Sequence, residues 1–311
     1  MTSKDRFLTA IRGGTSDRPP ASVWLHFASE HLPPAEVAEL HVKYQRAYDW
    51  DFVKVMNDYR LPLSGGDGEA LASAAALESV KALRADQAPL ATQLEVIRRI
   101  RDALGPDVPI VETLFDPLQT LLRSAGRSVL TLVRAEPRAA RHALEAITDS
   151  LCSYVLAVRE AGADGLFYSL NWAVSAAAGG LEDREFRALV EPLDARVLAA
   201  AEGMVRIGHV HGVNLDFGRV RDYPVEAFNW SHHRTAPTLA EARELTGRAL
   251  IGGIDEAVFS GQTLGEAELG LRRAVAEAGR AGLLIGPGCT VPPDTPRRLL
   301  EGVRRLVEGL A

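Results

Sequence analysis

The amino-acid sequence predicts one α/β domain over residues 1–311, folded as a (β/α)8 barrel of the TIM type. Three observations predict it. Short apolar segments alternate with amphipathic helical patterns along the chain, as in parallel strands joined by helices. There are eight such segments, the number that closes this barrel. No Gly-x-Gly-x-x-Gly or phosphate-loop motif follows any of them, so the usual mark of a nucleotide-binding open sheet is missing.

The composition agrees with a soluble enzyme. The chain has 311 residues, of which 47% are hydrophobic and 24% are charged. Its net charge of -6 argues against a nucleic-acid partner, which would need a clustered basic surface. No apolar run approaches the ~18–20 residues of a membrane span. Two cysteines and a charged, amphipathic N-terminal helix predict a cytoplasmic protein.

The predicted strands are brief, apolar and bounded by glycine, proline or charged residues, as buried parallel strands are. They cover residues 22–26, 51–56, 109–113, 165–169, 206–210, 226–230, 249–252 and 282–286. Besides the N-terminal helix, the clearest helical patterns cover residues 137–161, 238–246, 264–280 and 294–309. The Gly- and Ala-rich residues 64–87 are not typical of a strand, and we interpret them as a long βα excursion and a candidate lid.

Polar and reactive residues follow the predicted strands, where a barrel of this kind places its active site. Of the eight histidines, only His41 and His142 lie clearly on predicted helices. We interpret His26, after the first strand, and Asp58, after the second, as catalytic. The alternatives for Asp58 are a helix N-cap and an ion pair with Arg60. The candidate substrate-binding residues are Ser169, Asn171, Asn229 and Trp230.

His209, His211 and Cys289 form a candidate metal site. The two histidines alternate on the fifth strand and therefore share a face, and Cys289 follows the eighth strand. Two imidazoles and a thiolate suit zinc. Asn229 and Asp255 are candidates to accept hydrogen bonds from the histidine rings. The alternative is a pair of hydrogen-bonded histidines beside a neutral, buried cysteine.

Several segments, spread over nearly the whole chain, resemble the uroporphyrinogen decarboxylase superfamily, which also contains zinc-dependent corrinoid methyltransferases. They read RPPASVWLHFASEHLP (18–33), AGADGLFYSL (161–170), GHVHG (208–212), IGGIDE (251–256) and GPGCTVPPDTP (286–296). The resemblance implies a (β/α)8 barrel and, by analogy with the decarboxylases, a homodimer.

The chain departs from the decarboxylase branch where that branch binds its substrate. Those enzymes carry Met-Arg-Gln-Ala-Gly-Arg after the first strand, whereas residues 25–30 read LHFASE. Their tyrosine after the third strand has no counterpart in 115–125, and their Gly-His-Gly loop is Gly-Pro-Gly at 286–288. Asp58 and Ser169 do match the branch. Because arginines hold the carboxylates of the porphyrinogen, their loss argues against that substrate.

The methyltransferase branch carries His-x-Cys after the fifth strand and a cysteine after the eighth, both as zinc ligands. His209 and Cys289 match this pattern, and His211 stands where the branch has cysteine. In that branch zinc lowers the pKa of a substrate thiol, whose thiolate attacks a methyl group. Replacing thiolate by imidazole removes one negative charge, which makes the ion a stronger Lewis acid and its bound nucleophile less reactive.

The leading hypothesis is therefore a zinc-dependent methyltransferase-like enzyme, with methyl transfer to or from a small thiol or a corrinoid, and a corrinoid protein as candidate partner. The alternative is a metal-free decarboxylase of a tetrapyrrole or another carboxylated substrate, with Asp58 central. A third hypothesis is a non-catalytic tetrapyrrole- or corrinoid-binding protein.

Overall fold

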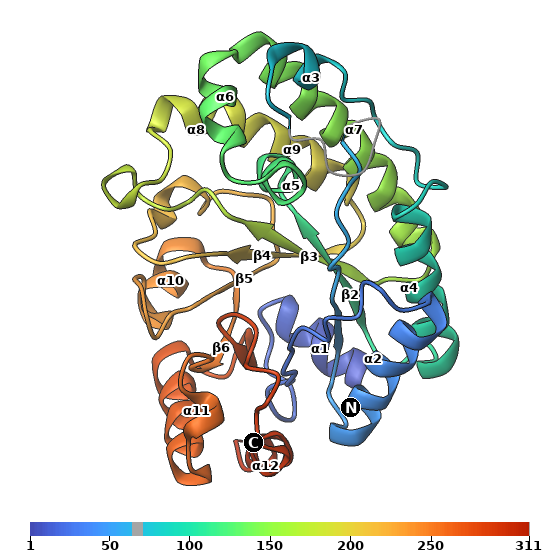
Figure 1. Cartoon of the computed structure of the whole chain (residues 1–311). Helices are drawn as coiled ribbons and strands as arrows, with labels where there is room; N and C mark the ends of the chain where they lie inside the picture. The colour runs from blue at the N-terminus through green and yellow to red at the C-terminus, as the bar shows by residue number, and fades with distance from the viewer. Residues whose placement is uncertain (64–70, 311) are drawn as a thin grey trace.

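The computed structural model of the chain describes residues 1–63 and 71–310. Within them, seven parallel strands form one curled sheet in which each strand pairs with the next along the chain (Figure 1). They are β1 (Val53–Val55), β2 (Ile110–Phe115), β3 (Gly165–Leu170), β4 (Val205–Val210), β5 (Ala227–Trp230), β6 (Ala249–Ile254) and β7 (Leu283–Pro287). Parallel pairing brings all their carboxyl ends to one rim.

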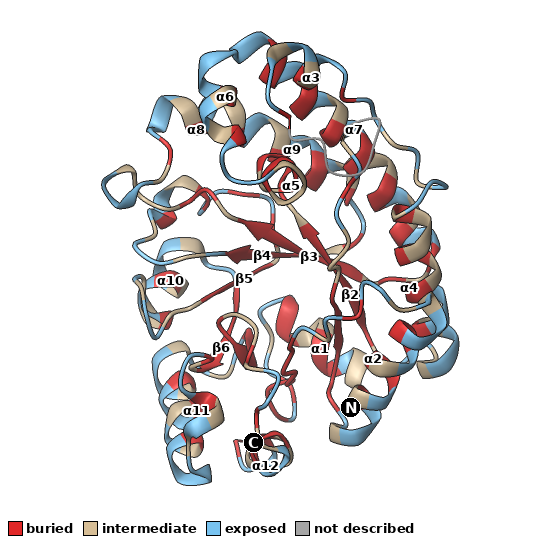
Figure 2. Ribbon diagram, viewed as in Figure 1, coloured by how far each residue is buried: buried red, intermediate tan, exposed pale blue. Residues whose placement is uncertain are grey.

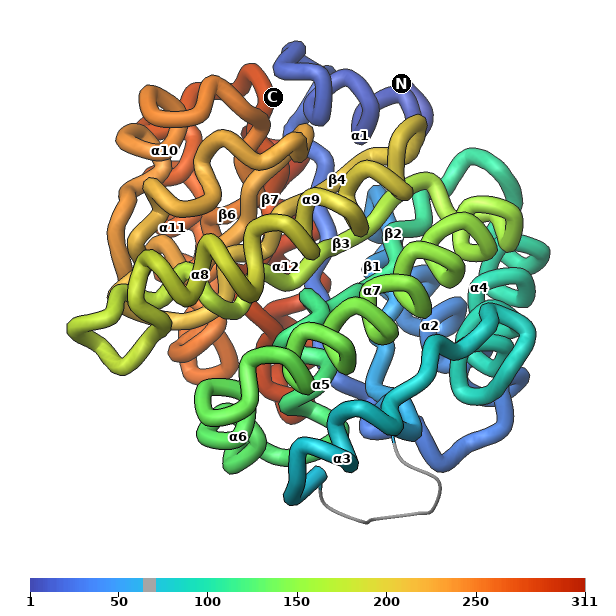
Figure 3. Tube along the Cα trace, turned by 90° about the horizontal axis from the view of Figure 1, so that it is seen from above, coloured from blue at the N-terminus to red at the C-terminus, as the bar shows by residue number. Residues whose placement is uncertain are grey.

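Helices surround the sheet, with their buried faces turned toward it (Figures 2 and 3). The α-helices are α1 (Ser3–Ile11), α2 (Pro34–Tyr48), α3 (Ala74–Glu78), α4 (Leu90–Leu104), α5 (Pro117–Ala125), α6 (Val129–Ala135), α7 (Pro137–Glu160), α8 (Asp183–Leu189), α9 (Glu191–Ala200), α10 (Leu239–Thr246), α11 (Leu264–Ala278) and α12 (Arg297–Glu308). Short 3-10 turns are η1 (Ala176–Ala178), η2 (Phe217–Arg219) and η3 (Phe259–Gly261). The helices predicted from sequence periodicity are confirmed.

The prediction of a first strand at residues 22–26 is wrong, because this segment is extended but does not form a strand. Its amino end closes the gap between β7 and β1. Pro20 O accepts a hydrogen bond from Ile285 N, and Ala21 O accepts one from Asp51 N, both at 2.8 Å. One parallel bridge, between Ala21 and Ile285, stands in place of a ladder. The described sheet therefore has seven strands and not the predicted eight.

The side chain of Trp24 explains why the ladder stops. Its indole lies against Gly286, where an added Cβ would meet the ring at 2.8 Å. The Trp24 carbonyl accepts its hydrogen bond from Val291, in the loop after β7, at 3.0 Å. The backbone thus bonds to a loop where a strand would bond to β7.

Side chains that point inward from the strands fill the space enclosed by the sheet. This inner core also receives α1, which packs against the amino ends of the strands and plugs that side. Its members are Phe7, Ala10, Ile11, Trp24, Phe52, Val111, Phe167, Ile207, Ala227, Ala249, Ile251 and Leu284. Because the lower interior is solid, a ligand has access only from the carboxyl rim.

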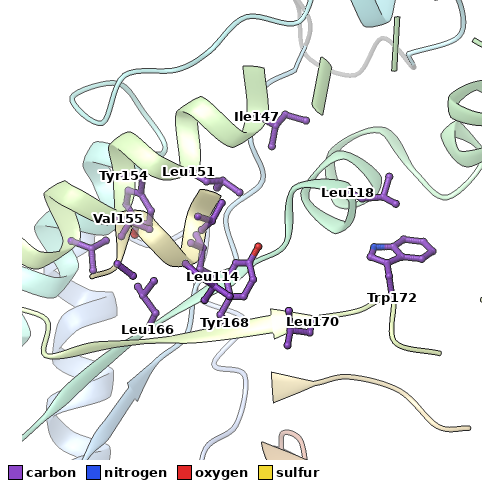
Figure 4. Close-up of a cluster of buried hydrophobic side chains, with 14 of the residues drawn as sticks. Leu114, Leu118, Ile147, Leu151, Tyr154, Val155, Leu166, Tyr168, Leu170 and Trp172 are labelled. Carbon is purple, nitrogen blue, oxygen red and sulfur yellow. The ribbon is translucent and has the colours of Figure 1, made fainter. Parts of the chain in front are cut away.

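The outer core lies between the sheet and the surrounding helices (Figure 4). On α7, apolar residues recur at helical spacing and share one buried cluster with outward residues of β2 and β3. The members labelled in the figure include Leu114, Ile147, Leu151, Tyr154, Val155, Leu166 and Tyr168. This layer fixes the strands from outside and leaves the rim to polar side chains.

The predicted excursion over residues 64–87 is only partly described, because residues 64–70 lie outside the described part. Its later half contains α3, and Leu77 and Val80 are buried against the outer core, with α3 packed on α7. Within the two described ranges, no helix combines the length and the apolar character that a membrane crossing requires.

A buried ionic cluster around Asp51 holds the seam between the two ends of the sheet. Arg18 donates to both carboxylate oxygens of Asp51, at 2.5 and 3.0 Å, and Arg6 on α1 donates at 2.7 Å. The Ala21 N–H donates to the same carboxylate at 2.8 Å. The Asp51 side chain is fully buried. One carboxylate thus joins α1, the extended segment and the start of β1.

We predict that Asp51→Asn lowers the free energy of unfolding by about 3–5 kcal/mol, because it leaves the buried Arg18 guanidinium without a carboxylate and leaves Arg6 with Asp17 alone. Urea denaturation at neutral pH measures this. Asp49→Asn is the matched control. Asp49 is an exposed residue paired with Arg304, and its loss should cost less than about 1 kcal/mol. Equal effects of the two substitutions would contradict the role given to Asp51.

Candidate functional site

His209, His211 and Cys289 converge at the carboxyl rim. His209 lies near the end of β4, His211 follows that strand, and Cys289 follows β7. Their ligand atoms all lie within 4.8 Å of one another. His209 Nε2 is 3.4 Å from His211 Nδ1, and Cys289 Sγ is 3.9 Å from the same nitrogen. Tetrahedral zinc would separate such atoms by about 3.3 Å (N to N) and about 3.6 Å (N to S), so this group could bind a metal ion.

Asn229 fixes the tautomer of His209. The Asn229 amide nitrogen donates to Ile251 O and to Pro287 O, both at 3.0 Å, so its oxygen must face His209. His209 Nδ1 lies 2.7 Å from that oxygen and therefore carries the proton. The lone pair of Nε2 is left for the metal group. The predicted hydrogen bond from His209 to Asn229 is therefore present.

The two histidines lie in a setting that favours neutral rings. Burial is the main cause that lowers the pKa of His209. Burial also lowers the pKa of His211, and the charges of the Asp116 and Glu256 carboxylates partly oppose this lowering. Neutral imidazole is the form that binds a metal ion. Both rings are thus ready to act as ligands at neutral pH.

Asp255 was predicted to accept a hydrogen bond from a histidine ring, and this prediction is wrong. Its carboxylate accepts a hydrogen bond from Ala257 N within its own turn. The next residue, Glu256, is the buried one. It accepts hydrogen bonds from Ser231 Oγ and from Gly288 N, just before Cys289. The sequence analysis missed Glu256, since a turn containing two adjacent acids does not indicate which one points inward.

A close backbone approach at Gly288 places Cys289. An added Cβ at Gly288 would lie 2.5 Å from Ser231 Cα and 2.7 Å from Trp230 O, so any side chain would push the loop outward. Burial opposes ionisation of the Cys289 thiol. In the metal-free protein, a proton shared with His209, which a doubly protonated ring donates from Nε2 to the sulfur, nevertheless holds the pKa of Cys289 below its ordinary value, with smaller contributions from Thr290 N–H and Lys54. The thiolate that a metal requires is thereby favoured.

Lys54 is a buried cation beneath this group. Its ammonium donates to Thr113 Oγ1 at 2.9 Å and lies 4.6 Å from the ring centre of Phe167, which stacks on His209. Among the described residues, no carboxylate forms an ion pair with it. Burial lowers its pKa to about 8, and the charges of Cys289, Glu112 and Asp58 oppose this. The sequence analysis missed Lys54, although a lysine within the apolar run 51–56 was a usable signal.

Asp58 and His26 form a second polar pair at the rim. Asp58 Oδ1 lies 2.7 Å from His26 Nδ1, and the His26 side chain is 47% exposed. Burial disfavours the Asp58 charge, but His26, Arg123 and Lys54 hold the pKa of Asp58 below its ordinary value. The alternative, an ion pair with Arg60, is not formed among the described residues. Asp58 is thus an ionised carboxylate that orients the accessible imidazole of His26.

Of the four candidate substrate-binding residues, Asn229 is fully buried and its amide is engaged by His209, Ile251 and Pro287, and the other three divide into two groups. Ser169 lies beside His209 in the sheet register, and Asn171 donates to its hydroxyl at 3.1 Å. Asn171 also donates to Asp116, which caps α5 as its place before a proline predicts. Trp230 does not lie at the substrate position that was predicted for it. It alternates with Asn229 along β5, so it points into the outer core, fully buried, and donates to Pro237 O.

Comparison with known proteins gives a family and a fold. Residues 67–309 match the uroporphyrinogen decarboxylase (URO-D) family. No curated protein matches the chain in sequence. A methyltransferase from Methanosarcina mazei is similar in structure, with a TM-score of 0.80, 18% identity and 99% of each chain covered. A B12-independent methionine synthase from Shewanella sp. W3-18-1 gives a TM-score of 0.57 and 13% identity, over 96% of this chain and 95% of that one.

The two cysteines should differ in reactivity. In metal-free Cys152→Ala protein, we expect Cys289 to be alkylated by iodoacetamide with a pH midpoint below the ordinary thiol value. In Cys289→Ala protein, the Cys152 midpoint should lie above it, because burial raises the pKa of Cys152. Rates measured against pH test this.

Lys54→Met in the Cys152→Ala background should raise the Cys289 midpoint, because it removes a favourable charge. Lys43→Met, at an exposed position of α2, is the control and should leave the midpoint unchanged. An unchanged midpoint in Lys54→Met would show that the ammonium does not act on the thiol.

Proposed function

The chain belongs to the uroporphyrinogen decarboxylase family, and we propose that it is a zinc-dependent methyltransferase of that family. One observation carries the proposal, namely the convergence of His209, His211 and Cys289 within 4.8 Å at the rim. The hydrogen bond from His209 to Asn229 supports it, because an oriented and neutral imidazole is what a metal ligand requires. The fold shared with a methyltransferase agrees with the proposal.

Three residues would hold the zinc ion in this proposal, with the fourth position left to substrate. When bound, zinc would lower the pKa of a substrate thiol, so that the thiolate is the nucleophile at neutral pH. His209 offers Nε2, His211 offers Nδ1 and Cys289 offers its thiolate. Asn229 keeps the His209 lone pair directed at the group.

His26 and Asp58 would move the proton. The Asp58 carboxylate holds the Nδ1–H of His26, which leaves Nε2 of an accessible ring free to accept the thiol proton. The sulfur then forms a bond to the methyl carbon. If the donor is a methyl-corrinoid, the cobalt–carbon bond breaks and its electron pair stays on cobalt. Ser169 and Asn171 would line the substrate position beside His209.

The charge of the site separates this protein from relatives with two cysteine ligands. One thiolate and two neutral imidazoles leave a net positive charge on a divalent ion, and Lys54 adds a second positive charge below it. A thiolate bound there would be strongly stabilised and less nucleophilic. We therefore propose slow turnover with simple thiols and a preference for a reactive methyl donor.

The metal site is tested by zinc content after purification without an affinity tag. We expect about one zinc ion per chain, lost in Cys289→Ala because that substitution removes the only anionic ligand of the set. Cys152→Ala should retain the ion, since Cys152 lies on α7 within the outer core. Equal zinc content in the two variants would contradict the proposed ligand set.

Methyl transfer is tested with zinc-loaded protein, methylcobalamin and a panel of small thiols. The expected result is loss of methylcobalamin absorbance with formation of the thioether, absent with Cys289→Ala and with chelator-treated protein. His26→Gln should lower the rate by about a hundredfold or more, as loss of a general base does. Stoichiometric zinc without transfer to any thiol would refute the methyltransferase and leave the metal site standing.

Uroporphyrinogen should not be a substrate. His26 and Glu30 stand where the decarboxylases have two arginines, and each lost charge-assisted contact costs roughly 1.5–3 kcal/mol. Restoring both arginines, as His26→Arg with Glu30→Arg, provides the comparison. The measurement is chromatography of the porphyrins after incubation with uroporphyrinogen. Formation of coproporphyrinogen by the unmodified protein would overturn this prediction and favour the metal-free decarboxylase.

A further inference from the structure

A small cavity of about 40 Å³ lies outside the barrel wall, behind the loop that carries Asp58. Its lining comes from that loop and from α4, α5 and α7, and includes Tyr59, Gln93, Arg123 and Ser124. None of the metal-group residues lines it, nor does His26 or Asp58. It is therefore a site separate from the one described above.

Three buried polar atoms around this cavity have no hydrogen-bond partner among the described residues. They are the Tyr59 hydroxyl, the Ser124 hydroxyl and the Gln93 amide oxygen. The Gln93 nitrogen donates to Met56 O and to both Glu112 oxygens, which fixes the amide so that its oxygen is left over. Buried polar groups without partners are costly, so these three atoms need partners inside the cavity, from water or from a small polar ligand.

Arg123 adds a positive charge on which the Asp58 carboxylate acts only from a distance. Its Nη2 makes only long contacts, at 3.4 Å, with the carbonyls of Asn57 and Asp58, and its guanidinium lies 3.9 Å over the Phe115 ring. No carboxylate in the described ranges forms an ion pair with it. Burial lowers its pKa. A guanidinium in such a place is a ready donor to a planar oxyanion.

We propose that this cavity binds a small planar oxyanion, either formate or hydrogen carbonate. Arg123 and the hydroxyls of Tyr59 and Ser124 would donate to its oxygens. A water molecule needs about 10–15 Å³ of such space, so 40 Å³ accommodates a group of about three or four heavy atoms. Hydrogen carbonate also carries a donor for the Gln93 oxygen, which formate lacks. Sulfate is tetrahedral and too large.

Equilibrium dialysis with isotopically labelled formate and hydrogen carbonate tests the proposal on the full chain, at constant ionic strength set with chloride. The expected result is saturable binding at one site per chain, with hydrogen carbonate the tighter ligand and sulfate a poor competitor. Arg123→Met should weaken binding by about tenfold or more, as loss of a charge-assisted hydrogen bond does. Arg127→Met, at an exposed position just after α5, should bind as the unmodified protein does.

Tyr59→Phe and Ser124→Ala are additional test variants, needed in case Arg123→Met fails to fold. Their hydroxyls have no hydrogen-bond partner within residues 1–63 and 71–310, so both variants should keep the unfolding midpoint of the anion-free protein. Each should weaken hydrogen carbonate binding several-fold. The proposal is overturned if the unmodified protein shows no saturable binding, if sulfate competes equally, or if binding survives Arg123→Met unchanged.

Discussion

The carboxylate of Asp51 is the contact on which the closed shape depends. A curled sheet of seven strands leaves a seam, and only the extended segment at residues 20–22 spans it, through three backbone hydrogen bonds. Asp51 reinforces that thin junction by holding Arg6, Arg18 and the Ala21 N–H together. Because the seam is closed, the loop after β7 and the side chains of β1 face each other across one rim. The metal group and the Asp58 pair therefore share this rim, and the charge of the buried Lys54 acts on both Cys289 and Asp58.

The chemistry of the rim follows from a second set of fixed contacts. Asn229 bonds to the carbonyls of two neighbouring strands and presents its oxygen to His209, so the imidazole is oriented by the backbone of the sheet. Gly288 allows the last loop to lie against β5, which brings Cys289 within reach. Fixed contacts thus hold His209 and place Cys289, whereas His211 lies in the loop just beyond the end of β4.

Periodicity and residue type predicted the strands after the first, the main helices and the set His209, His211 and Cys289, because parallel strands end at one rim. Side-chain direction and local competition limited the rest. The segment 22–26 has the pattern of a strand, but the bulk of Trp24 beside Gly286 decided otherwise. Trp230 was assigned to the pocket although strict alternation from Asn229 sends it outward. The lysine at position 54 stood out within an apolar strand, but its role depends on Thr113, Phe167 and Cys289, which are distant in sequence.

The donor set is also far apart along the chain, with His211 and Cys289 separated by 78 positions. An unfolded polypeptide cannot chelate an ion through groups so distant without closing a very long loop. On the ribosome, the two histidines emerge well before the cysteine, and the carbonyl of Pro287 that orients Asn229 emerges late as well. In the proposed zinc site, binding of the ion through all three residues would therefore await synthesis of the C-terminal segment.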